Sequence, residues 1–325
     1  MSKHRKVILL IILNALISFV LLIVTDYIFF KYIYNGYINS LNEKHKLEET
    51  DGHIRYKTFD FNIDDFHTTN VYNVFLEKKY YHDVIIPDKY NGKKAPIVLF
   101  GDSYTWLYPD TGLQKLLAEY TKRPVFNFAF WGWGAQHMYY LTQKDLLYKI
   151  INSENFEKNP EYIVYTYIRD HKNRLYSVMD YFLDIKPYLT YEKTNDKLKI
   201  KEYSFFHKLL FRLFLYRYFL NEHKNYDNTF SYNILYDLIN ESKKEILKHY
   251  PDIKFVILYY NQEKDIIKEE NEMFEKLRNM GFICISTKNL TKEDLSSSKY
   301  TDSDGYHPNP SAWRQIVPNF SKIFK

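Results

Sequence analysis

Residues 97–105 read IVLFGDSYT, and the organisation of the chain can be understood from this stretch. Its first four residues form a continuous apolar run, which is typical of a strand buried on both faces of a parallel sheet. Gly101, Asp102 and Ser103 follow directly, and residues of these types favour a tight turn and the start of a helix. The stretch therefore predicts a buried strand, a sharp turn and a helix.

Similar apolar runs recur along the chain. Four more are rich in β-branched and aromatic residues, at 125–130, 162–168, 255–260 and 282–286. Amphipathic stretches that suit helices lie between the runs, at 111–120, 138–151, 231–249 and 265–280. Strands that alternate with helices form a parallel sheet with helices on both faces, joined by right-handed crossovers. We therefore predict an α/β domain of three layers over residues 95–325.

One long insertion, at about 171–230, interrupts this alternation between the third and fourth runs. Its first part, 188–202, has the pattern of a hairpin that turns at 194–196. Its second part, 205–220, reads FFHKLLFRLFLYRYFL and has a wide apolar surface. This segment could be a lid, a wall of an acyl-binding site or a helix lying on a membrane. A helix packed on the main core is the alternative.

The amino-terminal segment 7–25 reads VILLIILNALISFVLLIVT and carries no charge. As a helix it would span about 28 Å at ~1.5 Å per residue, close to the ~30 Å hydrocarbon core of a membrane. Lys3, Arg5 and Lys6 precede it and should hold the N-terminus in the cytoplasm. A cleaved signal peptide is the alternative, but small residues follow such peptides, whereas residues 26–32 are mainly bulky and aromatic.

These features divide the chain into four parts. We predict a cytoplasmic tail at 1–6, a single-pass transmembrane anchor at 7–25, a stalk with an edge element at 26–94, and the α/β domain at 95–325. The domain would then lie outside the cytoplasm, held at the cell membrane by the N-terminal helix.

Composition and charge exclude several classes of protein. With 46% apolar and 26% charged residues, the chain can form a packed core and is not intrinsically disordered over its length. The net charge is +5, but three cations before residue 7 supply most of it, so a nucleic-acid partner has no electrostatic support. The single cysteine, Cys284, excludes an internal disulfide and a thiolate zinc cluster. Because no metal or nucleotide motif is present, we predict no metal and no organic cofactor.

Ligands of open α/β sheets bind beyond the carboxyl ends of the strands, and three such positions carry notable residues. The first run ends at Ser103, whose own N–H could face an oxyanion. The second run is followed by NFAFWGWG at 127–134, in which Gly132 and Gly134 stand close together although the chain has only nine glycines. Glycine lets the backbone adopt a positive φ or approach a ligand closely.

The third position is DGYH at 304–307, after the last run. A carboxylate three residues before an imidazole can accept one imidazole N–H and leave the other nitrogen free as a base. Asn309 can cap a helix that Pro310 starts and Pro318 ends, so we expect His307 on a rim just before that helix.

These three segments resemble conserved blocks of the SGNH hydrolases, also called GDSL esterases and lipases: GDSYT at 101–105 the first block, NFAFWGWG at 127–134 the second and DGYH at 304–307 the fifth. The resemblance covers roughly residues 95–325 and implies a flavodoxin-like α/β/α sandwich with a parallel five-stranded sheet. It also implies that Ser103 is the nucleophile, His307 the general base, Asp304 its orienting partner, and the N–H groups of Ser103 and Gly132 oxyanion donors.

The third block departs from the family pattern. The family has Gly-x-Asn-Asp after the third strand, with the asparagine side chain as an oxyanion donor, whereas Arg169 and Asp170 stand there in this chain. Loss of one oxyanion donor costs about 3 kcal/mol of transition-state stabilisation. Arg169 could supply a charged donor instead, or Asn173 or Arg174 could reach in.

The expected function is a serine esterase that hydrolyses O-acyl, above all O-acetyl, esters on an envelope or exported glycan through an acyl-enzyme. One alternative is an O-acyltransferase that passes the acyl group to a glycan hydroxyl, and another is a non-catalytic glycan-binding or assembly module that retains the fold. The partners would be an acylated glycan or a small ester. Six residues near the blocks are predicted to contact the substrate: Asp102, Trp131, Trp133, Gln136, His137 and Asp170. The two tryptophans among them could equally pack in the core.

Overall fold

The computed structural model describes two kinds of segment. Backbone and side chains are described over most of 84–175 (except 89, 109, 131 and 155), 228–261 and 266–325. Only the backbone is described for 189–194 and 197–202, and a few isolated helical positions are described between 14 and 28. The chain divides into two compact units, and the larger one, Phe59–Glu202 with Tyr226–Lys325, holds every element discussed below.

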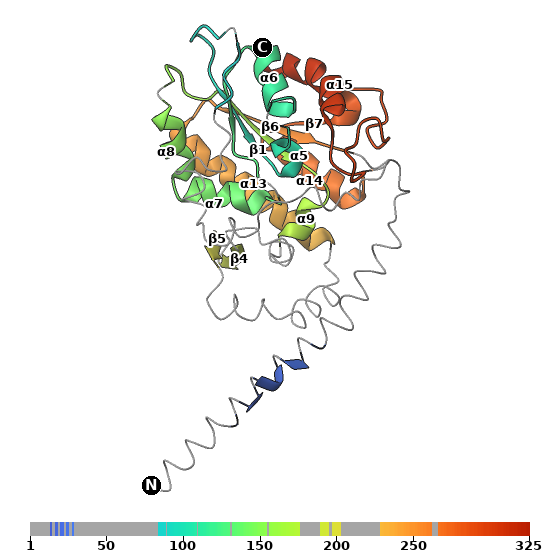
Figure 1. The fold of residues 1–325 in the computed structure, drawn as a ribbon. Helices are drawn as coiled ribbons and strands as arrows, with labels where there is room; N and C mark the ends of the chain where they lie inside the picture. The colour runs from blue at the N-terminus through green and yellow to red at the C-terminus, as the bar shows by residue number, and fades with distance from the viewer. Residues whose placement is uncertain are drawn as a thin grey trace. The chain divides into compact units, whose positions relative to one another are not determined.

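A parallel sheet of five strands forms the centre of this unit (Figure 1). Its strands, in spatial order, are β2 (Val125–Asn127), β1 (Ile97–Phe100), β3 (Tyr162–Tyr167), β6 (Lys254–Tyr259) and β7 (Ile283–Ser286). Every neighbouring pair in this sheet is parallel. This order is the flavodoxin-like one, in which the chain winds outward in both directions from the β1–β3 boundary, and such a boundary is where open sheets bind ligands.

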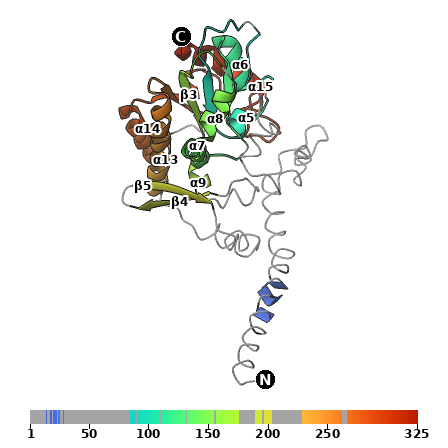
Figure 2. The same ribbon diagram turned by 90° about the vertical axis from the view of Figure 1, so that its left-hand side faces the viewer.

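Helices cover both faces of the sheet, which confirms the predicted three layers (Figures 1 and 2). One face packs against α6 (Leu113–Thr121) and α15 (Pro310–Phe320). The other face packs against four helices: α7 (Ala135–Gln143), α8 (Leu146–Ser153), α13 (Asn228–His249) and α14 (Lys268–Asn279). Successive strand side chains point to opposite faces, so Ile97 and Leu99 belong to one core and Val98 and Phe100 to the other.

Three predicted boundaries are wrong for local reasons. The strand predicted over 125–130 ends at Asn127, whose side-chain Oδ1 accepts the N–H of Ala129 at 3.0 Å and turns the chain. The helix predicted over 138–151 is two helices, because Asp145 adopts a left-handed φ of 57° between them. Pro318 does not end the last helix but lies inside α15, which continues to Phe320.

The insertion is described in part. Its hairpin is confirmed, with β4 (Leu189–Thr194) antiparallel to β5 (Lys197–Glu202). A short helix, α9 (His171–Arg174), begins the insertion directly after β3. The apolar segment 205–220 lies outside the described residues. Ahead of the sheet, Ile85 forms an antiparallel bridge with Val125, so this end of the predicted edge element pairs with β2.

Most of the predicted anchor, 7–25, also lies outside the described residues. The positions that are described there, including Ile17, Leu21 and Val24, are helical and exposed. Within the described part of the chain, no helix is both long enough and apolar enough to cross a membrane. The anchor therefore stays a prediction from the sequence.

Candidate active site

The serine turn (residues 101–103) connects β1 to a short helix, α5 (Ser103–Trp106). Asp102 caps this helix, because its Oδ1 accepts the N–H of Tyr104 at 3.0 Å. A Cβ on Gly101 would collide with the Thr105 hydroxyl and lie 3.2 Å from Cβ of Thr166. Only glycine therefore lets the chain turn this tightly over the end of the sheet.

A histidine from the far end of the chain meets this turn. Oγ of Ser103 lies 2.7 Å from Nε2 of His307, although 204 residues separate them. Nδ1 of the same ring is hydrogen-bonded to Oδ2 of Asp304. The other carboxylate oxygen of Asp304 accepts the N–H groups of Tyr306 at 2.8 Å and His307 at 3.0 Å. Asp304 thus holds both the ring and the backbone of the histidine, as its place three residues upstream predicts.

The charge of Asp304 is set by the same contacts. Burial alone would raise the pKa of this carboxyl, but the hydrogen bond from His307, the charge of that ring and the two backbone N–H groups lower it to about 2. The carboxylate is therefore ionised at neutral pH, which fixes the imidazole with its proton on Nδ1 and leaves Nε2 as the acceptor facing Ser103.

The histidine loop (residues 302–309) is fastened to helix α15. Oδ1 of Asn309 accepts the N–H groups of Ser311 and Ala312 at 2.9 and 3.2 Å, so Asn309 caps the helix as predicted. Its Nδ2 donates to the carbonyls of Lys299 at 3.0 Å and Thr301 at 2.9 Å. One side chain therefore joins the loop to the start of the helix that follows it.

Two contacts around His307 were not predicted. The hydroxyl of Tyr108 donates to Oδ2 of Asp302 at 2.5 Å and links the segment after α5 to the histidine loop. The ring of Tyr104 packs 5.1 Å from that of His307 and 5.3 Å from that of Tyr260. Local sequence patterns do not predict these contacts, since the partners are far apart in the sequence.

The glycine loop (residues 132–134) follows the end of β2. Gly132 has a positive φ of 74°, which side chains disfavour. The N–H of Gly134 donates to Nδ1 of His137 at 3.1 Å, and the N–H of Trp133 donates to the carbonyl of Phe130. Among the described residues, no hydrogen bond engages the N–H of Gly132 or of Ser103.

Most predicted substrate contacts are buried instead. Trp133, Gln136 and His137 are at most 2% exposed. The rings of Trp133 and His137 stack 5.0 Å apart, and Nε2 of Gln136 donates to the carbonyl of Arg174 at 3.0 Å. These three side chains pack in or beside the glycine loop, and their contact with substrate stays a prediction. Trp131 lies outside the described residues.

Both predicted acidic contacts bind Arg174, but only Asp102 is buried, since the Asp170 side chain is 41% exposed. Oδ2 of Asp102 accepts Nη1 of Arg174 at 2.8 Å, and Oδ2 of Asp170 accepts its Nε at 3.0 Å. Burial alone would raise the pKa of Asp102, but the Arg174 guanidinium and His171 hold it well below its usual range. Asp102 is therefore a buried, paired carboxylate, and its contact with substrate stays a prediction.

Arg169, at the position of the family asparagine, has a partner of its own. Its Nη2 lies 3.0 Å from Oε2 of Glu270, a side chain that is fully buried. The hydroxyls of Tyr167 and Tyr259 also donate to Glu270, at 2.8 and 3.0 Å. A buried carboxylate requires such compensation, which explains why a cation stands here. The guanidinium is paired with Glu270, and its suggested role as an oxyanion donor stays a prediction.

Comparison with solved structures finds distant likenesses to lipolytic proteins and carbohydrate esterases. A member of the lipolytic protein G-D-S-L family from Veillonella parvula is 12% identical, with 71% of this chain and 98% of that chain covered and a TM-score of 0.41. A carbohydrate esterase family 3 structure from Talaromyces cellulolyticus is 10% identical, with 71% and 96% covered and a TM-score of 0.39. An acetyl xylan esterase from Butyrivibrio proteoclasticus is 11% identical, with 71% and 63% covered and a TM-score of 0.41.

No family model and no curated protein matches the sequence. Likeness to solved structures at this distance assigns neither a family nor an activity to the chain. An activity for this chain therefore has to be inferred from its own residues, above all Ser103, Asp304 and His307.

Proposed function

We propose that this chain is a serine esterase that hydrolyses O-acyl, above all O-acetyl, esters on a glycan through an acyl-enzyme. The observation that carries the proposal is the contact of 2.7 Å between Oγ of Ser103 and Nε2 of His307. An imidazole oriented by a carboxylate on its other nitrogen can remove the hydroxyl proton as the oxygen attacks a carbonyl carbon. Asp304 occupies that orienting position.

The reaction would proceed in two steps. Ser103 attacks the ester carbonyl, its proton passes to Nε2 of His307, and the alcohol leaves with that proton, so that an acyl-serine remains. Water, deprotonated by the same nitrogen, then attacks the acyl-serine and releases the carboxylic acid. The N–H groups of Ser103 and Gly132 would hold the oxyanion in both steps, and no side chain is assigned the role of the family asparagine.

The glycan substrate is proposed from the predicted location of the domain. The apolar segment 7–25 and the cations before it favour a single-pass anchor with a cytoplasmic N-terminus, so the domain would face the envelope and the polymers exported through it. Transfer of the acyl group to a glycan hydroxyl would use the same acyl-enzyme, and an experiment can distinguish the two outcomes.

The decisive experiment uses the full-length chain in detergent with p-nitrophenyl acetate. We expect turnover and labelling by a fluorophosphonate, both abolished by Ser103→Ala and both retained by Ser298→Ala, which removes an exposed hydroxyl. Turnover that survives Ser103→Ala would refute the proposal. With an O-acetylated oligosaccharide, release of acetate would support hydrolysis, whereas acetyl groups recovered on an added unacetylated acceptor would indicate transfer.

A further inference from the structure

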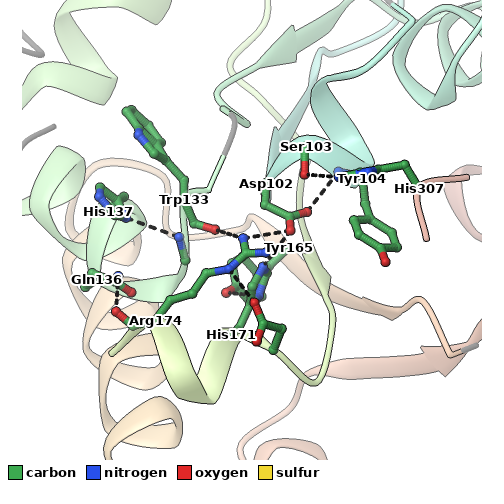
Figure 3. Close-up of polar contacts among 12 residues, drawn as sticks. Asp102, Ser103, Tyr104, Trp133, Gln136, His137, Tyr165, His171, Arg174 and His307 are labelled. Carbon is green, nitrogen blue, oxygen red and sulfur yellow. Dashed lines mark hydrogen bonds and ion pairs between the residues drawn. The ribbon is translucent and has the colours of Figure 1, made fainter. Parts of the chain in front are cut away.

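Arg174, the last residue of α9, reaches both loops that bear the proposed oxyanion donors (Figure 3). Its Nη1 donates to Oδ2 of Asp102 in the serine turn at 2.8 Å and to the carbonyl of Trp133 in the glycine loop at 3.0 Å. Its Nε donates to Asp170 at 3.0 Å. We propose that Arg174 is a positioning residue that sets the two backbone oxyanion donors relative to each other, a role that rests on the proposed esterase function.

On the serine side, both oxygens of Asp102 are committed. Oδ1 holds the first turn of α5 through the N–H of Tyr104, while Oδ2 binds Arg174. Asp102 is fully buried and Arg174 is 9% exposed, so each charge depends on the other for compensation. Because Asp102 directly precedes Ser103, movement of this carboxylate would move both the hydroxyl and the N–H of the serine.

A second buried side chain holds Asp102 from another direction. Nε2 of His171 lies 3.4 Å from Oδ2 of Asp102, and its Nδ1 is 2.7 Å from the hydroxyl of Tyr165. Burial is the largest influence on His171 and lowers its pKa, which favours a neutral ring. Arg174 is then the cation that balances the carboxylate, with His171 as a neutral neighbour.

On the glycine side, one peptide group is held at both ends. Arg174 binds the carbonyl of Trp133, and the next N–H, that of Gly134, donates to Nδ1 of His137. The carbonyl of Arg174 in turn accepts the side chain of Gln136. The peptide that Arg174 fixes is therefore the one between Trp133 and Gly134, and one peptide unit separates it from the N–H of Gly132, the proposed donor.

The missing asparagine gives this geometry its importance. Since Arg169 is bound to Glu270 and the side chain of Asn173 lies outside the described residues, we assign the oxyanion to two backbone N–H groups from two separate loops. A displacement of about 1 Å in a catalytic group can cost on the order of 100-fold in rate. Arg174 is hydrogen-bonded to both loops, so it can fix the spacing between them.

The chain offers a matched control at the other end of the sheet. Arg123 is also buried, at 7% exposed, and its guanidinium binds the carbonyls of Ala95 and Phe324 and the carboxylate of Glu161. Ala95 and Glu161 lie just before β1 and β3, and Phe324 packs against Tyr162 at the start of β3, so these partners are at the amino ends of the strands, away from Ser103. Arg123→Ala removes a similar buried guanidinium group that has no contact with the serine turn or the glycine loop.

We would measure kcat and KM of the full-length chain with p-nitrophenyl acetate, normalised to the fraction of Ser103 labelled by a fluorophosphonate. Arg174→Ala should lower kcat by about 10–100-fold with little change in KM. Arg174→Lys keeps a positive charge beside Asp102 but loses the planar guanidinium that bonds to both loops. This variant should therefore fold and still show a reduced kcat. Millimolar guanidinium should restore part of the kcat of Arg174→Ala. Arg123→Ala should lower the midpoint of thermal unfolding and leave kcat unchanged.

An unchanged kcat in Arg174→Lys, or an equal fall in kcat in Arg123→Ala, would overturn the positioning role while leaving the esterase proposal intact. Failure of guanidinium to rescue a folded Arg174→Ala would also count against it. A wild-type chain with no Ser103-dependent turnover would overturn the esterase proposal and this role together.

Discussion

Asp304 shows how a single side chain can both orient a proposed catalytic base and shape the loop that carries it. Its Oδ2 is hydrogen-bonded to the imidazole of His307, and its Oδ1 accepts the backbone N–H groups of Tyr306 and His307. The carboxylate therefore fixes the tautomer of the base and the shape of the loop that presents it. A neutral amide at this position would retain much of the shape but could not stabilise the imidazolium that forms during attack.

We predict that Asp304→Asn lowers kcat by about 10³–10⁴-fold, because the wrong tautomer would face Ser103. Its effect on stability should depend on pH. The folded carboxyl has a pKa depressed to about 2, so its contribution is present above the unfolded value near ~3.9 and is lost as the pH falls toward 2. Urea unfolding of both proteins should show a difference in stability at pH 6 that shrinks by pH 2.5. A difference independent of pH would contradict this account.

Local residue patterns were enough to predict Ser103, Asp304 and His307, because their motifs lie at strand ends or within four residues of one another. Arg174 and Tyr108 were not predicted in their observed roles. Their partners, Asp102 and Asp302, are 72 and 194 residues away in the sequence. Contacts of this kind depend on how the sheet and its loops are arranged in space. The spacing of residues along the chain therefore does not predict them.

At the scale of elements, helix α15 and the loop before it behave as one unit joined by Asn309. The side chain accepts two N–H groups of the helix and donates to the carbonyls of Lys299 and Thr301, just before the loop. Capping and loop support are therefore combined in one amide, and substitutions can separate them.

We predict that Asn309→Ala lowers the free energy of unfolding by about 1–2 kcal/mol, because it removes the helix cap. It should also lower kcat, since the histidine loop loses two hydrogen bonds. Asn309→Asp keeps an acceptor for the cap but no donor, so stability should largely return while kcat stays reduced. Denaturation midpoints and steady-state rates measure the two effects separately. Full activity in Asn309→Asp would show that the two donor bonds do not position His307.

The strands were easier to predict than the helices, for a physical reason. Strands buried on both faces are continuous apolar runs, so β1 and β3 stand out from the sequence. The break between α7 and α8 depends on the left-handed conformation of Asp145, which the apolar pattern around it does not reveal.

At the scale of the whole molecule, the predicted anchor decides which substrates the site could meet. We predict that the full-length chain stays with membranes after alkaline carbonate extraction, and that a protease added to intact cells digests the domain. Replacing Leu13 and Leu16 by arginine should release the chain, since each charge at a helix centre costs about 2.5–3.5 kcal/mol. The same positions changed to alanine serve as the control. A wild-type chain extracted by carbonate would refute the anchor.

The contact between Ser103 and His307 joins the first strand of the sheet to the loop before the last helix. During synthesis, a ribosome releases Ser103 some two hundred residues before His307, and α15 must then pack its buried Trp313 and Phe320 onto the sheet. A chain made only as far as residue 306 therefore lacks this contact. Reactivity of Ser103 toward a fluorophosphonate would therefore appear only once the domain is complete. The time course of this labelling could be used to follow folding of the domain on the ribosome or after export.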